Sequence, residues 1–155
     1  MIAAEPPPPS GLWSRLPQTR CFIDTKVLIY ADSGDEARKQ HIAIDLLRHL
    51  RMQRLGVLST QVLNEYVQVG LRKLGLPHSH LREQLRLYRQ FDLSVVTPET
   101  MELALELHQR HALSYWDALI LASAHIAGCA VLLTEDMEHG ELLAGVRLLN
   151  PFAEA

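Results

Sequence analysis

The sequence lacks the features that would place the protein in a membrane or outside the cell. Its 155 residues contain no apolar run that approaches the roughly 20 residues of a membrane-spanning helix. Its first residues do not combine a basic start with an apolar stretch, as a secretory signal does. We therefore expect a soluble, cytoplasmic protein without a membrane partner.

The sequence also has few cysteines and no excess of basic charge. Only two cysteines are present, Cys21 and Cys129. Both fall in strand-like runs, and buried free thiols are a better interpretation than a disulfide bond. The net charge of −3 argues against a uniformly basic surface for nucleic acid. Any contact with nucleic acid would need a local basic patch.

The chain divides into a short proline-rich segment and one domain. Residues 1–20 contain four consecutive prolines and no periodic apolar pattern, which predicts a disordered or loosely docked tail. Residues 21–155 are enough for one domain with its own core. In this domain short apolar runs alternate with longer helical patterns, which is typical of βαβ units around a parallel sheet of four to five strands.

The expected elements alternate along the chain. The expected strands are 21–24, 56–59, 93–96, 130–134 and 146–149. The expected helices are 27–31, 35–54, 60–74, 78–90, 98–111 and 114–128, with a short helical turn after residue 136.

Four carboxylates stand alone in apolar surroundings. Asp24 and Asp136 each follow a predicted buried strand, whereas Glu65 and Asp117 are each the only charged residue in a long helical stretch. Ligands of an open parallel sheet bind outside the carboxyl ends of its strands. We therefore expect Asp24 and Asp136 at that edge, and Glu65 and Asp117 in the first turns of helices that leave it.

Each acid also has a simpler structural explanation. Asp117 stands three residues after Ser114 and could complete a capping box, and Asp136 could cap a following helical turn. Glu65 could lie on a solvated helix face, and Asp24 could close a turn. Because these explanations would have to hold four times independently, one shared site is the better hypothesis.

A shared site of carboxylates has a definite chemistry. Clustered carboxylates repel one another, so at neutral pH they need bound cations or shifted pKa values. Oxygen ligands select a hard cation such as Mg²⁺ or Mn²⁺. Such an ion activates water and neutralises the leaving oxygen at a phosphodiester. The residues by themselves therefore predict a metal-dependent phosphoryl-transfer site.

Four segments around these acids resemble the PIN-domain family, and most closely its VapC-type toxin branch. They are FIDTKVLIYA (22–31), STQVLNE (59–65), SYWDALI (114–120) and LTEDMEHG (133–140), in the family's order. The resemblance implies a three-layer α/β/α domain around a central parallel sheet. It also implies a Mg²⁺- or Mn²⁺-dependent endoribonuclease toxin that inhibits translation, forms a homodimer and is held in check by a cognate VapB-type antitoxin.

The resemblance also assigns roles by position. The catalytic, metal-binding role falls on Asp24, Glu65, Asp117 and Asp136. Thr134 matches a position whose hydroxyl supports the site. Lys26 departs from the pattern, because the family usually has asparagine there. Its ammonium group could neutralise a carboxylate and compete with metal, extend outward, or contact RNA. The alternative function is therefore a catalytically impaired module that binds RNA or antitoxin.

Other residues suggest surfaces. The most basic stretch consists of Arg72, Lys73, Arg82, Arg86 and Arg89. It could guide RNA phosphates toward the acids, although a solvated helix face explains it equally well. The aliphatic residues Val62, Val69, Leu81 and Leu85 could form a dimer face or an antitoxin groove, although core packing is the commoner use of such spacing. For Trp116 and His139 a core or supporting role is expected.

A different aspartate-based phosphoryl enzyme on a similar scaffold is disfavoured. One such class carries a second acid two residues after the first, where this chain has Lys26. No glycine-rich phosphate loop appears either.

Overall fold

A computed structural model describes residues 18–153. The predicted tail, residues 1–20, therefore lies outside the described residues except for its last three.

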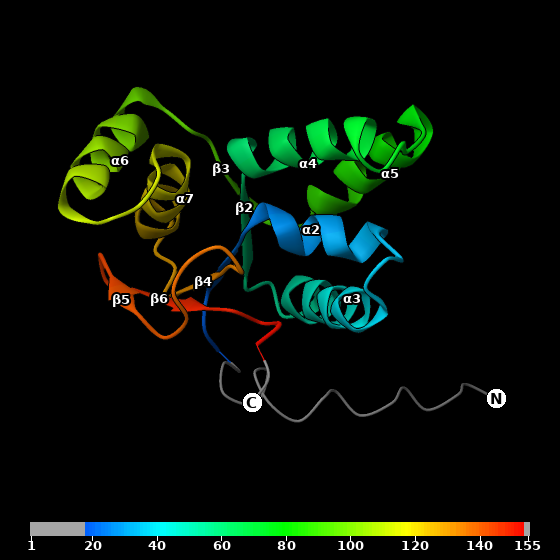
Figure 1. Ribbon diagram of the computed structural model, residues 1–155, viewed down its shortest axis with the longest axis horizontal. Helices are drawn as coiled ribbons and strands as arrows, with labels where there is room; N and C mark the ends of the chain where they lie inside the picture. Colours follow the sequence, from blue (N-terminus) through cyan, green and yellow to red (C-terminus); the bar gives the residue numbers. More distant parts are fainter. Residues whose placement is uncertain (1–17, 154–155) are drawn as a thin grey trace.

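A sheet of six strands forms the centre of the domain, in the order β3-β2-β1-β4-β6-β5 (Figure 1). The strands are β1 (Cys21–Ile23), β2 (Gly56–Ser59), β3 (Asp92–Ser94), β4 (Val131–Leu133), β5 (Leu142–Leu143) and β6 (Val146–Leu149). Only β5 pairs antiparallel with its neighbour. The expected parallel strands are confirmed, and β5 is an addition. With two residues, β5 is too short to leave a recognisable pattern.

Helices cover both faces of the sheet. They are α2 (Thr25–Asp32), α3 (Ala37–Met52), α4 (Thr60–Arg72), α5 (His78–Tyr88), α6 (Pro98–Arg110) and α7 (Tyr115–Ile126). Figure 1 shows α6 and α7 together on one side of the sheet and α2 to α5 on the other. The expected three-layer α/β/α architecture is confirmed. No helix within residues 18–153 is both long and apolar enough to cross a membrane.

The two central strands are the most deeply buried part of the sheet. Phe22 of β1 and Leu132 of β4 are partners in the parallel register, and both are completely buried. Burying one such side chain contributes about 1.5 to 3 kcal/mol. The same register pairs Ile23 with Leu133. Asp24 and Thr134, which follow these two residues, are therefore brought side by side at the carboxyl edge.

Two local predictions were wrong. The segment after Asp136 is a bend rather than a helical turn. The backbone N–H of Asp136 donates to the Thr134 hydroxyl at 3.2 Å, and the chain then turns at Gly140, which has a φ of 90°. Cys129 precedes β4 instead of lying in a strand, but both Cys129 and Cys21 are buried and free, as expected.

Candidate active site

Asp24 lies at the centre of the site. It is 5% exposed, and it caps the N-terminus of α2, where its Oδ1 accepts a hydrogen bond from the Thr25 backbone N–H at 2.7 Å. Its Oδ2 accepts from the Thr134 hydroxyl at 2.7 Å. Burial raises the pKa of Asp24 to about 6 although both hydrogen bonds oppose the shift. Thr134 thus hydrogen-bonds to Asp24, and its role in supporting the site stays a prediction.

Glu65 is tied to the same helix terminus. Its Oε2 accepts from the Thr25 hydroxyl at 2.6 Å, and its Oε1 accepts from Gln61 Nε2 at 3.0 Å. The sequence predicted Glu65 in the first turn of its helix. This was wrong, because Glu65 is the sixth residue of α4 and lies in the second turn. The Glu65 side chain still reaches the carboxyl edge of the sheet, because it hydrogen-bonds there to the Thr25 hydroxyl.

Asp117 lies in the first turn of α7, as predicted. Its backbone N–H donates to the hydroxyl of Ser114, the N-cap residue, at 3.1 Å. The capping explanation is thus correct for Ser114, and it leaves the Asp117 carboxylate half-buried at the start of the helix. Burial raises the pKa of Asp117, and the charges of Asp136 and Glu65 add to this rise.

Asp136 is held by a cation from the same chain. Its Oδ1 accepts a hydrogen bond from Lys26 Nζ at 2.6 Å, and Nζ also lies 3.7 Å from Oε1 of Glu135. Lys26 therefore extends toward the acids. Its hydrogen bond to Asp136 raises the pKa of Lys26, which keeps the ammonium group charged.

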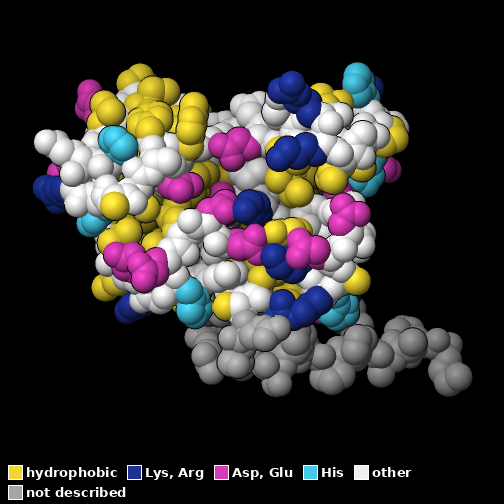
Figure 2. Space-filling view, in the orientation of Figure 1, with side chains coloured by type: hydrophobic (Ala, Val, Ile, Leu, Met, Phe, Trp, Pro, Cys, Tyr) yellow, Lys and Arg dark blue, Asp and Glu magenta, His cyan; other side chains and the backbone are white. Residues whose placement is uncertain are grey.

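The four acids lie in one region of the molecule, with Asp24 buried beneath the others. The charges of Asp136 and Glu65 raise the pKa of Asp24 and also that of Asp117, so these two carboxylates lie near both Asp24 and Asp117. Figure 2 shows acidic side chains gathered near the centre of this face, with basic side chains among them. The assembly of Asp24, Glu65, Asp117 and Asp136 into one metal-binding site stays a prediction.

The carboxylates are not arranged as a finished metal centre. Within residues 18–153, no three His, Cys, Asp or Glu side chains are positioned to hold one ion. Asp136 is engaged by Lys26, and Glu65 is engaged by Thr25 and Gln61. The donor set consists of carboxylate oxygens, which fits a hard divalent cation. A cation bound to all four acids would compete with Lys26 for Asp136.

Three residues of the site were not anticipated from the sequence. Thr25 and Gln61 orient Glu65, and Glu135 accepts hydrogen bonds from Tyr30 at 2.6 Å and from Lys39 at 2.7 Å. Burial raises the pKa of Glu135, but these hydrogen bonds outweigh it and lower the pKa overall. Only Gln61 had a usable signal, because residues four apart on a helix are neighbours.

The basic stretch runs from the C-terminal end of α4, at Arg72 and Lys73, to the C-terminal end of α5, at Arg89. All five of its side chains are exposed, and none forms an ion pair within residues 18–153. Glu65 and Arg72 are seven residues apart on α4, a rise of roughly 10 Å. RNA contact by Arg72, Lys73, Arg82, Arg86 and Arg89 therefore stays a prediction.

Core packing accounts for part of the predicted aliphatic surface. Val62 and Leu81 are buried in the core, so an exposed dimer face or groove is wrong for these two. Val69 and Leu85 are half-buried.

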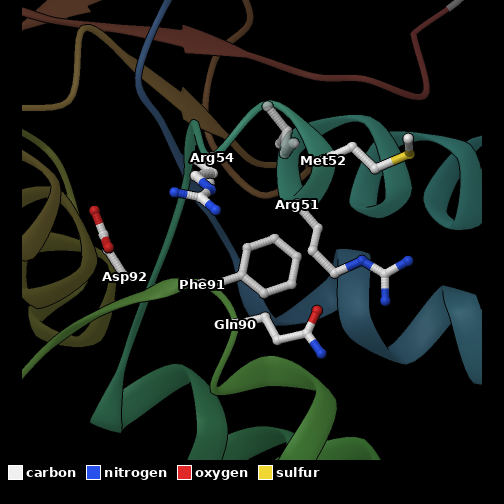
Figure 3. Close-up of a pocket in the computed structure, with 8 residues that line it drawn as sticks. Arg51, Met52, Arg54, Gln90, Phe91 and Asp92 are labelled. Atoms are coloured by element: carbon white, nitrogen blue, oxygen red, sulfur yellow. The ribbon is translucent and has the colours of Figure 1, made fainter.

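A cavity of about 760 Å³ lies away from the acids. Figure 3 shows Phe91 in this cavity, with Arg51, Arg54 and Gln90 around it. Its lining includes the residues that begin β2 and β3. The cavity thus belongs to the amino ends of the strands, whereas Asp24 and Asp136 follow the carboxyl ends. Cavity size therefore does not identify the site in this fold.

Stability in the absence of divalent metal should depend on pH through Asp24. Its pKa rises from 3.8 to about 6 on folding, so the folded state binds the proton more tightly than the unfolded state. The contribution of Asp24 to stability should therefore be largest below pH 4 and fall by about 3 kcal/mol as pH rises past 6.

Urea unfolding in EDTA at pH 4.5 and pH 7 measures this effect. The difference in the free energy of unfolding between wild type and Asp24→Asn should change with pH, because the variant cannot titrate at this position. Parallel pH profiles for the two proteins would show that burial does not disfavour the Asp24 carboxylate.

Comparison with known proteins gives a family model and a set of similar structures. The PIN-domain model matches residues 21–142. VapC20 of Mycobacterium tuberculosis, described as a sarcin-ricin loop cleaving toxin, superimposes with a TM-score of 0.60 at 22% identity, over 75% of this chain and 89% of that chain. VapBC2 of Rickettsia felis, bound to a DNA fragment from its promoter, superimposes with a TM-score of 0.59 at 16% identity, over 83% of this chain and 96% of that chain. No curated protein gives a significant match.

Proposed function

The chain belongs to the PIN-domain family, and from this premise we propose that it is a VapC-type endoribonuclease toxin. It would hydrolyse RNA phosphodiester bonds with the help of Mg²⁺ or Mn²⁺ and thereby inhibit translation. A cognate VapB-type antitoxin would neutralise it. The fold likeness to a toxin described as cleaving the sarcin-ricin loop and to a VapBC complex supports this proposal.

One observation carries the proposal: Asp24 is buried and is coupled to other carboxylates. A carboxylate that is 5% exposed, beside the charges of Asp136 and Glu65, is unfavourable unless something compensates for it. A structural role would be served equally well by a neutral side chain. A divalent cation would compensate for this charge and explain why acids occupy all these positions.

The side chains of the chain itself perform the positioning. Asp24, Glu65, Asp117 and Asp136 would hold the cation, which supplies Lewis acidity for a phosphate oxygen and for a water molecule when bound. The Thr134 hydroxyl fixes the orientation of Asp24, and the Thr25 hydroxyl fixes that of Glu65. Such preorganisation lowers the cost of reaching the transition state, because the groups do not have to reorient during reaction.

The remaining parts of the proposal concern partners and boundaries. The basic residues on α4 and α5 would attract RNA phosphates by an effect that weakens with salt. A homodimer and the antitoxin complex are proposed from the family resemblance. We also propose that residues 21–155 form the nuclease domain and that residues 1–20 are an appended tail.

A second candidate function is favoured by the position of Lys26. Its ammonium group lies 2.6 Å from Asp136, where it takes up one of the four acids. If Lys26 stays there in solution, the protein is a PIN-like module that binds RNA or antitoxin without cutting.

Cleavage of a mixed RNA pool separates the two candidates. Purified protein, free of antitoxin, should cut RNA in Mg²⁺ or Mn²⁺ and should stop cutting when EDTA removes the metal. Absence of cleavage, together with absence of metal binding by calorimetry, would rule out the enzyme and leave the binding module.

A further inference from the structure

Trp116 is an exposed aromatic side chain directly beside a site acid. It is 63% exposed, so of the two expected roles, core or supporting, the core role was wrong. It lies in the first turn of α7, immediately before Asp117, and its ring contacts that of Tyr115 edge-on at 5.6 Å between centroids. Large exposed apolar surfaces commonly mark interaction sites. The contact with Tyr115 supports the indole and leaves most of the Trp116 side chain exposed.

Trp116 borders a groove of about 730 Å³, which we call the Trp116 groove. Its walls are largely apolar and include Val67 of α4, Met101 of α6 and Leu119 of α7. The exposed amides of Asn64 and Gln68 also line it. This volume and this mixture of apolar walls with a few polar groups are typical of small-ligand sites. Figure 2 shows hydrophobic side chains gathered over α6 and α7 on this face.

Gln61 connects the groove to the acids. It is 8% exposed and lines the groove together with Glu65. Its Nε2 donates to Glu65 Oε1 at 3.0 Å and to the Trp116 backbone carbonyl at 3.3 Å. Its Oε1 is buried and has no hydrogen-bond partner within residues 18–153. Gln61 therefore joins the backbone of Trp116 to the carboxylate of Glu65, and this contact holds the two sides of the groove together.

We propose that the Trp116 groove binds one unpaired nucleobase of the RNA substrate, stacked on Trp116. This inference rests on the proposed function, because it places a base of that substrate next to the acids that act on the phosphate. Every base has a face that stacks on an aromatic ring. The exposed side chains of Asn64 and Gln68 supply amide donors and acceptors for the edge of the base.

The continuity of the groove with the acids identifies the occupant. Glu65 lines the groove and belongs to the acidic cluster, so a ligand in the groove lies beside the position of the scissile phosphate. Proteins recognise single-stranded RNA chiefly by stacking splayed-out bases on aromatic side chains and reading their edges with hydrogen bonds. The groove therefore selects an RNA whose base next to the cleaved bond is unpaired.

Binding of short single-stranded RNA to the full-length chain tests the inference. In Mg²⁺, on the Asp24→Asn background that leaves RNA uncut, Trp116→Ala should weaken binding by about 5- to 100-fold. Trp116→Phe should keep most of the affinity, because phenylalanine still stacks. The matched control is Ile126→Ala at the other end of α7, where a 48% exposed side chain is removed. The affinity of this control should not change.

An RNA with one abasic position makes the test specific for stacking. Moving the abasic position along the RNA should reveal one place where it weakens binding to the parent protein and has no effect on Trp116→Ala. Three outcomes would each overturn the inference. In the first, the parent and Trp116→Ala bind RNA with the same affinity; in the second, Trp116→Ala loses as much affinity for every abasic RNA as for the intact RNA. In the third, the parent binds none of the RNAs. If sedimentation shows that Trp116→Ala changes the oligomeric state, this face forms a contact between copies of the chain instead. Cleavage by the wild type, measured separately, reports the proposed function.

Discussion

The Asp24→Asn variant is expected to lose metal-dependent RNA cleavage by about a hundredfold or more while it keeps the fold. Asparagine has nearly the same shape as aspartate, and its carbonyl can accept one of the two hydrogen bonds that Asp24 receives from Thr25 and Thr134. The charge is what the substitution removes. Because burial already raises the pKa of Asp24 to about 6, removing this charge should not destabilise the protein in EDTA.

Initial cleavage rates in Mg²⁺ measure the effect, and circular dichroism checks the fold. The matched control is Asp35→Asn, which removes an exposed carboxylate that takes part in no ion pair within residues 18–153. It should cut at the wild-type rate. Cleavage by Asp24→Asn at that rate would exclude Asp24 from the reaction, whereas an unfolded variant would show that Asp24 is needed for the structure.

The sequence predicts the sheet well because the central strands are apolar on both faces. In β1 and β4 every residue is buried, and such short continuous runs between helical patterns indicate a parallel sheet. Strand β5 has only two residues and depends on pairing with β6. Its formation is set by the turn between them, where Ala144 and Gly145 both have positive φ. A pattern of hydrophobicity cannot reveal so short a pairing.

The sequence suggests the four acids as candidates, but it does not reveal the contacts around them. Parallel strands end at one edge, so the residues after β1 and β4 were expected at that edge, but the sequence does not show that these two strands are adjacent. The hydrogen bond between Lys26 and Asp136 joins residues 110 positions apart, and the exposure of Trp116 depends on how α4, α6 and α7 leave a groove between them. The hydrogen bond and the exposure of Trp116 both depend on how the helices pack on the sheet, which the sequence pattern does not show.

The Lys26→Asn substitution is expected to raise the affinity for Mn²⁺ by about tenfold and to increase cleavage in parallel. The Lys26 ammonium group lies 2.6 Å from Asp136 and 3.7 Å from Glu135, so a cation must compete with it for Asp136. Its side chain is 43% exposed, so solvent screens the interaction, and about 1 to 2 kcal/mol is an appropriate magnitude. One tenfold change in affinity corresponds to about 1.4 kcal/mol.

Calorimetric titration with Mn²⁺ and cleavage rates in the same buffer measure the two effects together. Lys39→Asn is the matched control, because Lys39 bonds to Glu135 at 2.7 Å and leaves Asp136 paired with Lys26. It should not raise metal affinity. If Lys26→Asn leaves both quantities unchanged, the ammonium group moves aside without cost and the departure from the family pattern is incidental. If metal affinity stays the same but RNA binding and cleavage fall, Lys26 contacts the RNA backbone and compensates for the negative charge of the acids.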